Sequence, residues 1–488
     1  MEIINIYFFC NNMYKKYRNV KYYNGDFMRE YNFDISDVNL DLARKISKNR
    51  ALTNKYLPIK IINKELLLLA PHKNIKDTKE LEFLYASKIK VKETREEYVL
   101  SLIEAVFFGQ EDNIFEEILK RAINLNSSDI HFEPQREDIL IRFRVDGILH
   151  PIYKLNYEEY TKLITKVKVM GNMDITEKRR PQDGKLYQKI NGNNYDLRLS
   201  TIPILYGEKL VIRILYSEVF NYNIESLNMN TLQKNKLNKM ISLNNGLIII
   251  NGPTGSGKSS TLYSILKEIN KKDINITTLE DPIEVIIKGI NQMSLNKKAG
   301  VTFSTGLRSI LRQDPDVIMV GEIRDEETAK MAVTASLTGH KVYSTIHTKT
   351  PGEVFYRLED MGVKSYLIKD SIVGIISQRL IRILCCNCKV KEKLYNLKWG
   401  SFYNHISKGC TYCNFTGYKG RKVVSTVVLI DENNKNKENI YKEIEEDGNM
   451  GMIDNLKELL IRGEISIKDY NKFLIEEGLE YEENKIIS

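Results

Sequence analysis

The sequence predicts an α/β protein built around a parallel sheet that helices cover on both faces. The first observation is a set of continuous apolar strands separated by helical patterns, which is typical of buried parallel sheets. The second is a change of pattern over residues 129–216, where apolar and polar residues alternate with period two between turn residues. The chain has 488 residues, enough for two to four domains. The continuous apolar strands lie at residues 246–250, 274–280, 315–322 and 341–347.

The N-terminal part of the chain carries no chemical motif. Residues 54–71 predict two short strands around a turn. Residues 14–29 interleave basic and aromatic side chains, a pattern of nucleic-acid or anionic-lipid contact as well as of a solvated surface. Apolar spacing then predicts helical structure. We assign residues 1–95 to an N-terminal region and residues 96–112 to a linker helix.

Two further domains follow, joined by a linker at residues 217–228. The alternating strands and one helical segment, "NYEEYTKLITKVKVMG", predict a compact α/β domain over residues 113–216. The continuous apolar strands belong to a larger domain, residues 229–488, whose last part, residues 430–488, is expected to be helical.

Composition excludes several classes of protein. The net charge of +9 is small for this length and the charges are scattered, so they do not indicate nucleic-acid binding. No apolar run approaches the roughly 20 residues that a membrane span needs, and the N-terminus does not resemble a signal peptide. We therefore expect a cytoplasmic protein without a transmembrane segment. In that reducing compartment, clustered cysteines bind metal more often than they form disulfides.

The strongest chemical signal is the stretch "GLIIINGPTGSGKSSTL", residues 246–262. It matches GxxxxGK[ST] between a buried strand and a helix, the context in which this pattern binds phosphates. Backbone N–H groups turn towards the phosphates, and the helix adds its positive N-terminal end. Lys258 is expected to reach the β- and γ-phosphates of ATP and Ser259 to bind Mg²⁺. The predicted nucleotide-binding residues are Gly252, Pro253, Thr254, Gly255, Ser256, Gly257, Lys258, Ser259 and Ser260.

Acidic and histidine residues flank three further strands of the predicted sheet. Ligands of parallel sheets bind at the carboxyl ends of the strands, where a carboxylate can hold Mg²⁺ through water or polarise an attacking water. Two histidines around one strand end suggest sensing of the γ-phosphate. The plainer alternative is that the acids cap helices or pair with nearby arginines. The candidates are Glu280, Glu284, Glu322, His340 and His347.

Several of these stretches resemble the secretion ATPases of type II secretion and type IV pilus assembly. The stretch "LRQDPDVIMVGEIRD", residues 311–325, resembles that family's signature, and "SSDIHFEP", residues 127–134, resembles its N2 domain. "TLEDPIE", residues 278–284, resembles its Asp box, and "TGHKVYSTIHT", residues 338–348, its His box. The resemblance covers about residues 113–421, in the family's order.

The resemblance implies a fold and a set of catalytic residues. It implies a PAS-like N2 domain, a RecA-like P-loop ATPase domain and a weak N1-like region, assembled as a homohexamer. Arg198 and Arg213 stand at the family's arginine-finger positions, where a guanidinium neutralises charge on the γ-phosphate, and Arg180 is a weaker candidate. Glu322 resembles the Walker B carboxylate, supported by the two Asp-box glutamates. Which of the three activates water stays open.

Cysteines form two C-x-x-C pairs separated by 21 residues, close to the spacing of a four-thiolate zinc site. Four sulfurs complete a tetrahedron, so the zinc would be structural. Buried thiols and disulfides are the alternatives. The resemblance adds that the pilus-assembly and secretion branches of the family carry a tetracysteine zinc loop here, residues 385–421. Cys386 is the predicted spare thiol, and the predicted ligands are Cys385, Cys388, Cys410 and Cys413.

These expectations combine into one function. The chain is expected to be a hexameric ATPase of the pilus-extension branch that drives assembly of type IV pili or of a type II secretion pseudopilus. Its partners would be an inner-membrane platform protein and a cytoplasmic adaptor, which would hold it at the inner face of the cytoplasmic membrane. No nucleic acid is expected. The alternatives are a RecA-like nucleic-acid motor, for which a base-stacking motif is missing, and a non-hydrolysing adaptor, which a damaged phosphate loop would indicate.

Overall fold

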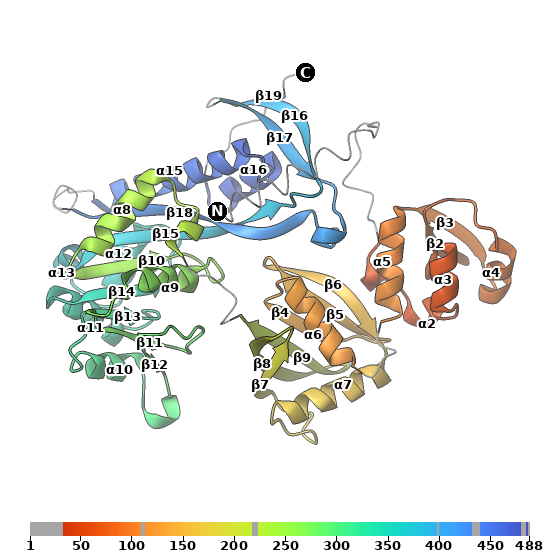
Figure 1. Cartoon of the computed structure of the whole chain (residues 1–488), viewed down its shortest axis with the longest axis horizontal. Coiled ribbons are helices and arrows are strands. Elements are labelled where there is room, and N and C mark those ends of the chain that lie inside the picture. The colour runs from red at the N-terminus through yellow and green to blue at the C-terminus, as the bar shows by residue number, and fades with distance from the viewer. Residues whose placement is uncertain are drawn as a thin grey trace. The chain divides into compact units, whose positions relative to one another are not determined.

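The computed structural model of the protein describes residues 33–108, 113–216, 223–397, 400–431, 440–479 and 485–486. The basic and aromatic segment at residues 14–29 lies outside these ranges. The chain forms two compact units (Figure 1). The first holds Met1–Glu218 and Lys408–Thr416, and the second holds Val219–Ser407 and Gly417–Ser488.

Residues 33–108 form a small α/β fold in the first unit. Its elements are α2 (Leu40–Ala43), α3 (Lys48–Asn54), β1 (Leu57–Ile62), β2 (Glu65–Ala70), α4 (Thr78–Tyr85), β3 (Lys88–Glu93) and α5 (Glu96–Val106). The strands β1 and β2 are the two that the sequence predicts around a turn. Asn63 and Lys64 close this hairpin with positive φ angles of 49° and 65°, as two-residue hairpin turns favour. Helix α5 lies where the linker helix was expected, and its Val99 and Ile103 are buried in the core of this fold.

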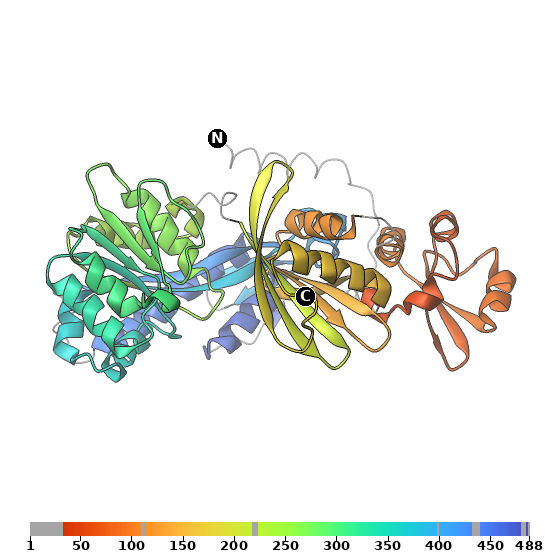
Figure 2. The ribbon, with the colours of Figure 1, turned by 90° about the horizontal axis from the view of Figure 1, so that it is seen from below.

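The second part of the first unit is a six-stranded antiparallel sheet in the order β6-β5-β4-β9-β8-β7. Helices α6 and α7 cover one face of it (Figure 2). Ile130 and Phe132 are buried in the core on that face, so the residues that alternate with them lie on the opposite, polar face. The elements are α6 (Ile114–Asn124), β4 (Asp129–Pro134), β5 (Ile139–Val145), β6 (Ile148–Leu155), α7 (Tyr157–Met170), β7 (Gln182–Ile190), β8 (Asn193–Ile204) and β9 (Gly207–Leu215).

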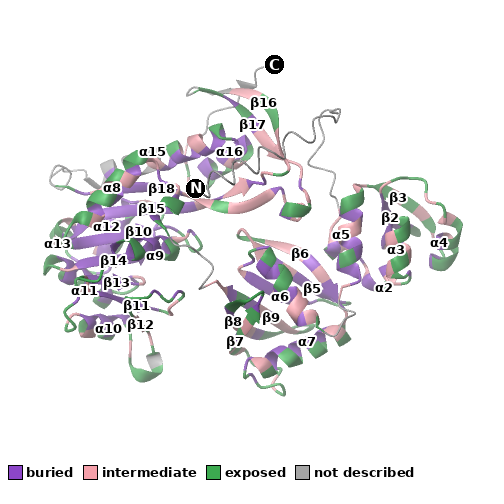
Figure 3. Ribbon diagram, viewed as in Figure 1, coloured by how far each residue is buried: buried purple, intermediate pink, exposed green. Residues whose placement is uncertain are grey.

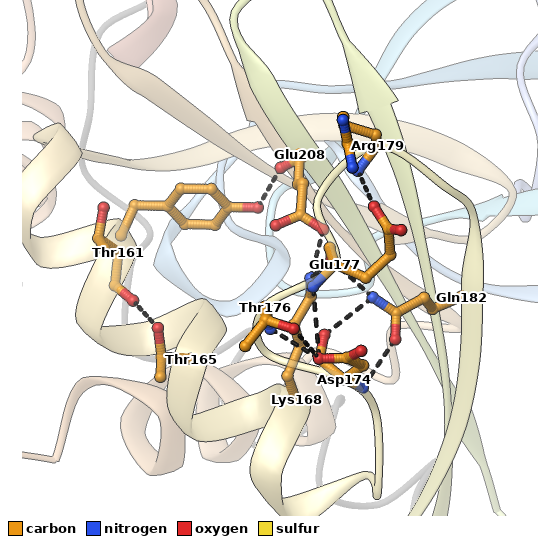
Figure 4. Close-up of polar contacts among 10 residues, drawn as sticks. Thr161, Thr165, Lys168, Asp174, Thr176, Glu177, Arg179, Gln182 and Glu208 are labelled. Atoms are coloured by element: carbon orange, nitrogen blue, oxygen red, sulfur yellow. Dashed lines mark hydrogen bonds and ion pairs between the residues drawn. The ribbon is translucent and has the colours of Figure 1, made fainter.

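A buried ion pair anchors the loop between α7 and β7 (Figure 4). Lys168, whose side chain is 2% exposed, pairs with Glu208 and also donates to the carbonyl of Glu177 at 2.9 Å. Gln182 binds the same carbonyl through Nε2 at 2.9 Å. Both contacts fix the loop backbone, while Arg180, the weaker arginine candidate, keeps an exposed side chain.

The second unit contains a seven-stranded sheet in the order β12-β11-β13-β14-β10-β15-β18, parallel except for β18. Its elements are α8 (Thr231–Ser242), β10 (Gly246–Asn251), α9 (Lys258–Ile269), β11 (Ile276–Glu280), β12 (Asn291–Ser294), α10 (Phe303–Ile310), β13 (Val317–Val320), α11 (Glu326–Leu337), β14 (Lys341–Ile346), α12 (Glu353–Asp360), α13 (Ser365–Ser371), β15 (Ile372–Leu384) and β18 (Tyr418–Leu429). Leu247 and Ile249 of β10 pack with α10 to α13, whereas Ile248 and Ile250 pack with α8 and α9. The central strands are therefore buried on both faces (Figure 3), which confirms the predicted α/β class.

The C-terminal part adds a small sheet and two helices to the second unit. These elements are β16 (Lys389–Leu397), β17 (Gly400–Ser407), α15 (Ile440–Ile461), α16 (Ile467–Glu476) and β19 (Lys485–Ile486). The segment Lys408–Thr416 instead packs within the first unit, where Arg95 donates to the carbonyls of Lys408 and Gly409 at 2.8 and 3.2 Å. Among the described helices, none has the length and apolarity needed to cross a membrane.

Candidate functional site

The phosphate loop joins the carboxyl end of β10 to the start of α9. Gly257 caps α9 in the left-handed region with φ +89°, which glycine adopts without strain. Gly252 has φ +150°, and an added Cβ there would lie 2.5 Å from the carbonyl oxygen of Gln378. Glycine is therefore required at both positions for the loop to keep this shape.

Gln378 on β15 fixes the phosphate loop through two hydrogen bonds. Its Nε2 donates to the carbonyl of Ser256 at 2.8 Å, and its Oε1 accepts from the hydroxyl of Thr261 at 2.8 Å. The side chain is fully buried, so both bonds are shielded from water. No sequence pattern predicts a role for this residue, because a glutamine within an apolar strand matches no motif.

The loop leaves polar groups available for a ligand. The hydroxyl oxygen of Ser256 is buried and has no hydrogen-bond partner in the described part of the chain. Ser259 and Ser260 are exposed in the first turn of α9. A phosphate can satisfy the first group, and a P-loop serine in the position of Ser259 is a ligand for Mg²⁺.

Lys258 lies folded onto its own loop. Its Nζ donates to the carbonyls of Gly252 at 2.7 Å and Pro253 at 3.0 Å, and lies 3.5 Å from Nδ1 of His347. The pKa of Lys258 is lowered to about 8, mainly by burial; Glu322 opposes this shift and Arg379 adds to it. In this structure the ammonium therefore donates to neutral carbonyl oxygens. The charged phosphate oxygens of a nucleotide can replace them.

This pKa predicts that nucleotide affinity falls as pH rises above about 8. Phosphate favours the ammonium form, which is populated below that pH and lost above it, so ADP affinity should decrease about tenfold from pH 7 to pH 9. Calorimetric titration in buffers of different ionisation enthalpy should also show proton uptake near pH 8. Glu322→Gln, which removes the group that raises this pKa, should move the midpoint to lower pH. An affinity that stays constant from about pH 7 to pH 9 would contradict the assignment.

Glu322 and His347 continue this set of contacts at the ends of neighbouring strands. Glu322 follows β13 and pairs with Arg324, and its other oxygen lies 3.4 Å from Nε2 of His347. Because an ammonium only donates and a carboxylate only accepts, the geometry fits a neutral His347 with its proton on Nε2. Burial lowers the pKa of His347, and nearby Lys258 lowers it further. The contacts therefore connect the phosphate loop to Glu322 at the end of β13.

The Asp-box glutamates differ from Glu322 in their surroundings. Glu280 is 3% exposed, and its carboxylate accepts bonds from Tyr263 at 2.5 Å, Thr278 at 2.6 Å and Gln292 at 3.0 Å. Glu284 is exposed, and its backbone N–H donates to the same Tyr263 hydroxyl at 3.3 Å. The hydroxyl of Tyr263 on α9 thus links residues 280 and 284 to the phosphate-loop helix. No sequence motif predicts this role for Tyr263.

The two histidines do not share a strand end. His347 follows β14 at its carboxyl end, whereas His340 precedes β14 and bonds through Nδ1 to the carbonyl of Ala335 at 3.1 Å. The intervening strand of six residues separates them by about 20 Å at the usual rise. The expectation of a histidine pair around one strand end is therefore corrected, and the structure brings only His347 to the phosphate loop.

Arg198 and Arg213 are direct cross-strand partners on the polar face of the six-stranded sheet. Arg213 donates through Nε to Asp129 at 2.9 Å, whereas Nε of Arg198 is buried without a partner in the described residues. Like charges directly opposite each other destabilise a sheet. An anion between the two guanidinium groups would offset that repulsion.

The four predicted metal ligands form one cluster. The Sγ atoms of Cys385, Cys388, Cys410 and Cys413 lie within 4.8 Å of one another. The sulfurs of Cys410 and Cys413 are 3.8 Å apart, which matches the edge of a tetrahedron with Zn–S bonds of about 2.3 Å. Cys386 is outside the cluster, as the spacing predicts. The set is compatible with a structural zinc ion.

The fold and the loop define a P-loop nucleotide-binding protein, with the site at the carboxyl edge of a parallel sheet. The chain belongs to the Type II/IV secretion system protein family, whose model matches residues 109–472. This membership confirms the resemblance seen in the sequence and supports an ATP-hydrolysing enzyme.

Individual relatives are consistent with this family. A type II secretion system protein E of Aeromonas hydrophila is 43% identical over 323 residues, covering 64% of each chain. The type IV pilus assembly ATPase TfpB of Acinetobacter baylyi is 40% identical over 333 residues, covering 65% of this chain and 56% of TfpB. The chain thus matches less than two thirds of the length of these relatives. The ATPase DotB of Legionella pneumophila shares the fold, with a TM-score of 0.58 at 23% identity, covering 76% of this chain and 98% of DotB.

Proposed function

We propose that this chain is a motor ATPase that drives assembly of type IV pili or of a type II secretion pseudopilus. The observation that carries the proposal is the contact series from Lys258 through His347 to Glu322, in a member of the secretion family. It joins the lysine that we propose to bind phosphate to the carboxylate that we propose to receive a proton from water. A non-hydrolysing adaptor would not need this connection.

In the proposed reaction, loop N–H groups and Lys258 hold the β- and γ-phosphates. Mg²⁺, when bound at Ser259, neutralises phosphate charge. A water oxygen attacks the γ-phosphorus and the bond to the β-phosphate oxygen breaks, giving ADP and phosphate. Glu322 orients the water, because it shares the contact series with His347 and Lys258, whereas Glu280 is buried among Tyr263, Thr278 and Gln292. The exposed Glu284 supports the Asp box.

The contacts of His347 depend on whether a nucleotide is bound. In the structure it lies near both Lys258 and Glu322. When Lys258 moves to the phosphates, Nδ1 of His347 becomes available and, as an acceptor in this tautomer, can accept a hydrogen bond from the attacking water. Loss of the γ-phosphate lets Lys258 return to the loop carbonyls, so the two states differ in a few named contacts.

Arg198 and Arg213 are proposed to be arginine fingers in a homohexamer, where they would neutralise the γ-phosphate during transfer. The resulting motion would pass to an inner-membrane platform protein and a cytoplasmic adaptor, which would place the motor at the inner face of the cytoplasmic membrane. The four cysteines would hold structural Zn²⁺. These proposals are based on the names of two relatives, a type II secretion system protein E and a type IV pilus assembly ATPase.

A strain that carries Glu322→Gln in place of the native chain tests the proposal. The variant should bind ATP, hydrolyse it about 100-fold more slowly or worse because the proton acceptor is lost, and fail to produce surface fibres or secreted protein. Glu327→Gln on α11, an exposed acid paired with Arg308, is the matched control and should behave as wild type. Normal fibres and secretion in the Glu322→Gln strain would contradict the proposal. Turnover that rises strongly with DNA would favour the nucleic-acid motor.

A further inference from the structure

A row of charged residues crosses the polar face of the six-stranded sheet. Strand register places Arg144 of β5, Asp129 of β4, Arg213 of β9, Arg198 of β8 and Lys185 of β7 side by side. Cross-strand partners share a face and lie close together. The row therefore holds four cations and one carboxylate, and that carboxylate is adjacent to a proposed finger.

Asp129 contacts the guanidinium of Arg213 only through its Nε. Its Oδ1 accepts from Nε of Arg213 at 2.9 Å, and its Oδ2 accepts from the hydroxyl of Ser128 at 2.8 Å and lies 3.6 Å from Nε of Arg144. Asp129 is 6% exposed, whereas the side chain of Arg213 is 63% exposed. Nη1 and Nη2 of Arg213 make no hydrogen bond within the described ranges.

This geometry has a chemical consequence. A guanidinium binds phosphate oxygens best through two parallel N–H groups, and the two terminal nitrogens form one such fork. A carboxylate that bound both terminal nitrogens would block that fork. Contact through Nε alone restrains the long side chain while the fork stays available, and it offsets repulsion from Arg198 next to it.

We propose that Asp129 is a positioning residue for ATP hydrolysis, which acts by holding the guanidinium of Arg213 ready for the γ-phosphate. The inference rests on the proposed function of Arg213 as a finger. It assigns a role to an acid that no nucleotide contact requires.

Glu133 provides a matched control on the same strand and the same face. It also binds two cations, Arg142 at 2.6 and 2.8 Å and Lys209 at 2.7 Å. Neither Arg142 nor Lys209 is a partner of Arg198 or Arg213 in the strand register. If Asp129 only stabilised the sheet, Glu133→Gln and Asp129→Asn would have similar effects.

The test is steady-state ATPase kinetics of the full chain with four variants. Asp129→Asn should lower kcat about tenfold, since a displaced group costs up to about 100-fold, and leave KM for ATP nearly unchanged. Glu133→Gln should keep wild-type kcat. Arg213→Ala should lose about 1,000-fold or more, and Asp129→Asn combined with Arg213→Ala should be no slower than Arg213→Ala alone. Asp129→Glu, which keeps the carboxylate, should recover much of the lost kcat.

The results separate the inference from the function on which it rests. Wild-type kcat in Asp129→Asn, equal losses in Asp129→Asn and Glu133→Gln, or losses that multiply in the double variant would each overturn the positioning role. Wild-type kcat in Arg213→Ala would overturn the finger and the positioning role together. If Asp129→Asn fails to fold, a kcat for Asp129→Glu as low as that of Arg213→Ala would also overturn the positioning role.

Discussion

Replacement of Lys258 by alanine should abolish ATP turnover, with a loss of about 100-fold or more, because the ammonium neutralises charge on the phosphates in a shielded loop. Lys258 is 8% exposed, and its Nζ is already close to both loop carbonyls and to His347. No other described lysine contacts the loop carbonyls in this way. The measurement is phosphate release by the purified full chain at saturating ATP and Mg²⁺.

A control on the same helix separates chemistry from folding. Lys267→Ala removes an exposed lysine from the last turn of α9 and should retain wild-type turnover. The thermal midpoint of Lys258→Ala should stay near that of the wild type, since its bonds to the loop are not part of the core. Turnover that survives in Lys258→Ala would show that the site has been placed wrongly.

Cys388→Ser should release the metal, whereas Cys386→Ser should keep it. The two residues are neighbours in one turn, and only Cys388 belongs to the sulfur cluster. Structural zinc sites contribute about 10–16 kcal/mol through four ligands, so the loss of one thiolate should weaken zinc binding by about 100-fold or more. Zinc content by atomic emission should be one equivalent in the wild type and in Cys386→Ser, and close to none in Cys388→Ser after dialysis.

Loss of zinc should also be visible in stability. A site that rarely forms in the unfolded chain stabilises the folded chain by its binding energy, so the thermal midpoint of Cys388→Ser should fall and that of Cys386→Ser should not. Wild-type protein without zinc, or equal zinc in the two variants, would return the cysteines to the alternative of buried thiols.

Local patterns made the nucleotide site predictable. Strand, loop, lysine and helix are contiguous from residue 246 to residue 262, and each piece depends on near neighbours in sequence. The partners of this loop were not predictable. Gln378 holds the carbonyl of Ser256 from 122 residues away, and only the pairing of β10 with β15 brings the two together.

The histidines and arginines show the same limit. His340 and His347 are close in sequence, but the extended strand β14 lies between them, so they are at opposite ends of that strand. Conversely, Asp129 and Arg213 are 84 residues apart and form one ion pair, because β4 and β9 are adjacent strands. Sequence distance is therefore a poor measure of contact wherever strands separate or join residues.

The fold class, the phosphate loop and the four clustered cysteines were predictable from the amino-acid sequence alone. Hydrophobic periodicity, loop chemistry and ligand spacing are local properties that a few neighbouring residues specify. The three-dimensional fold was needed to show that His347 and not His340 lies at the loop, that Glu280 is enclosed by hydrogen bonds, and that Asp129 binds Arg213. Those outcomes depend on strand order and register, which the packing of the whole core sets and no single stretch encodes.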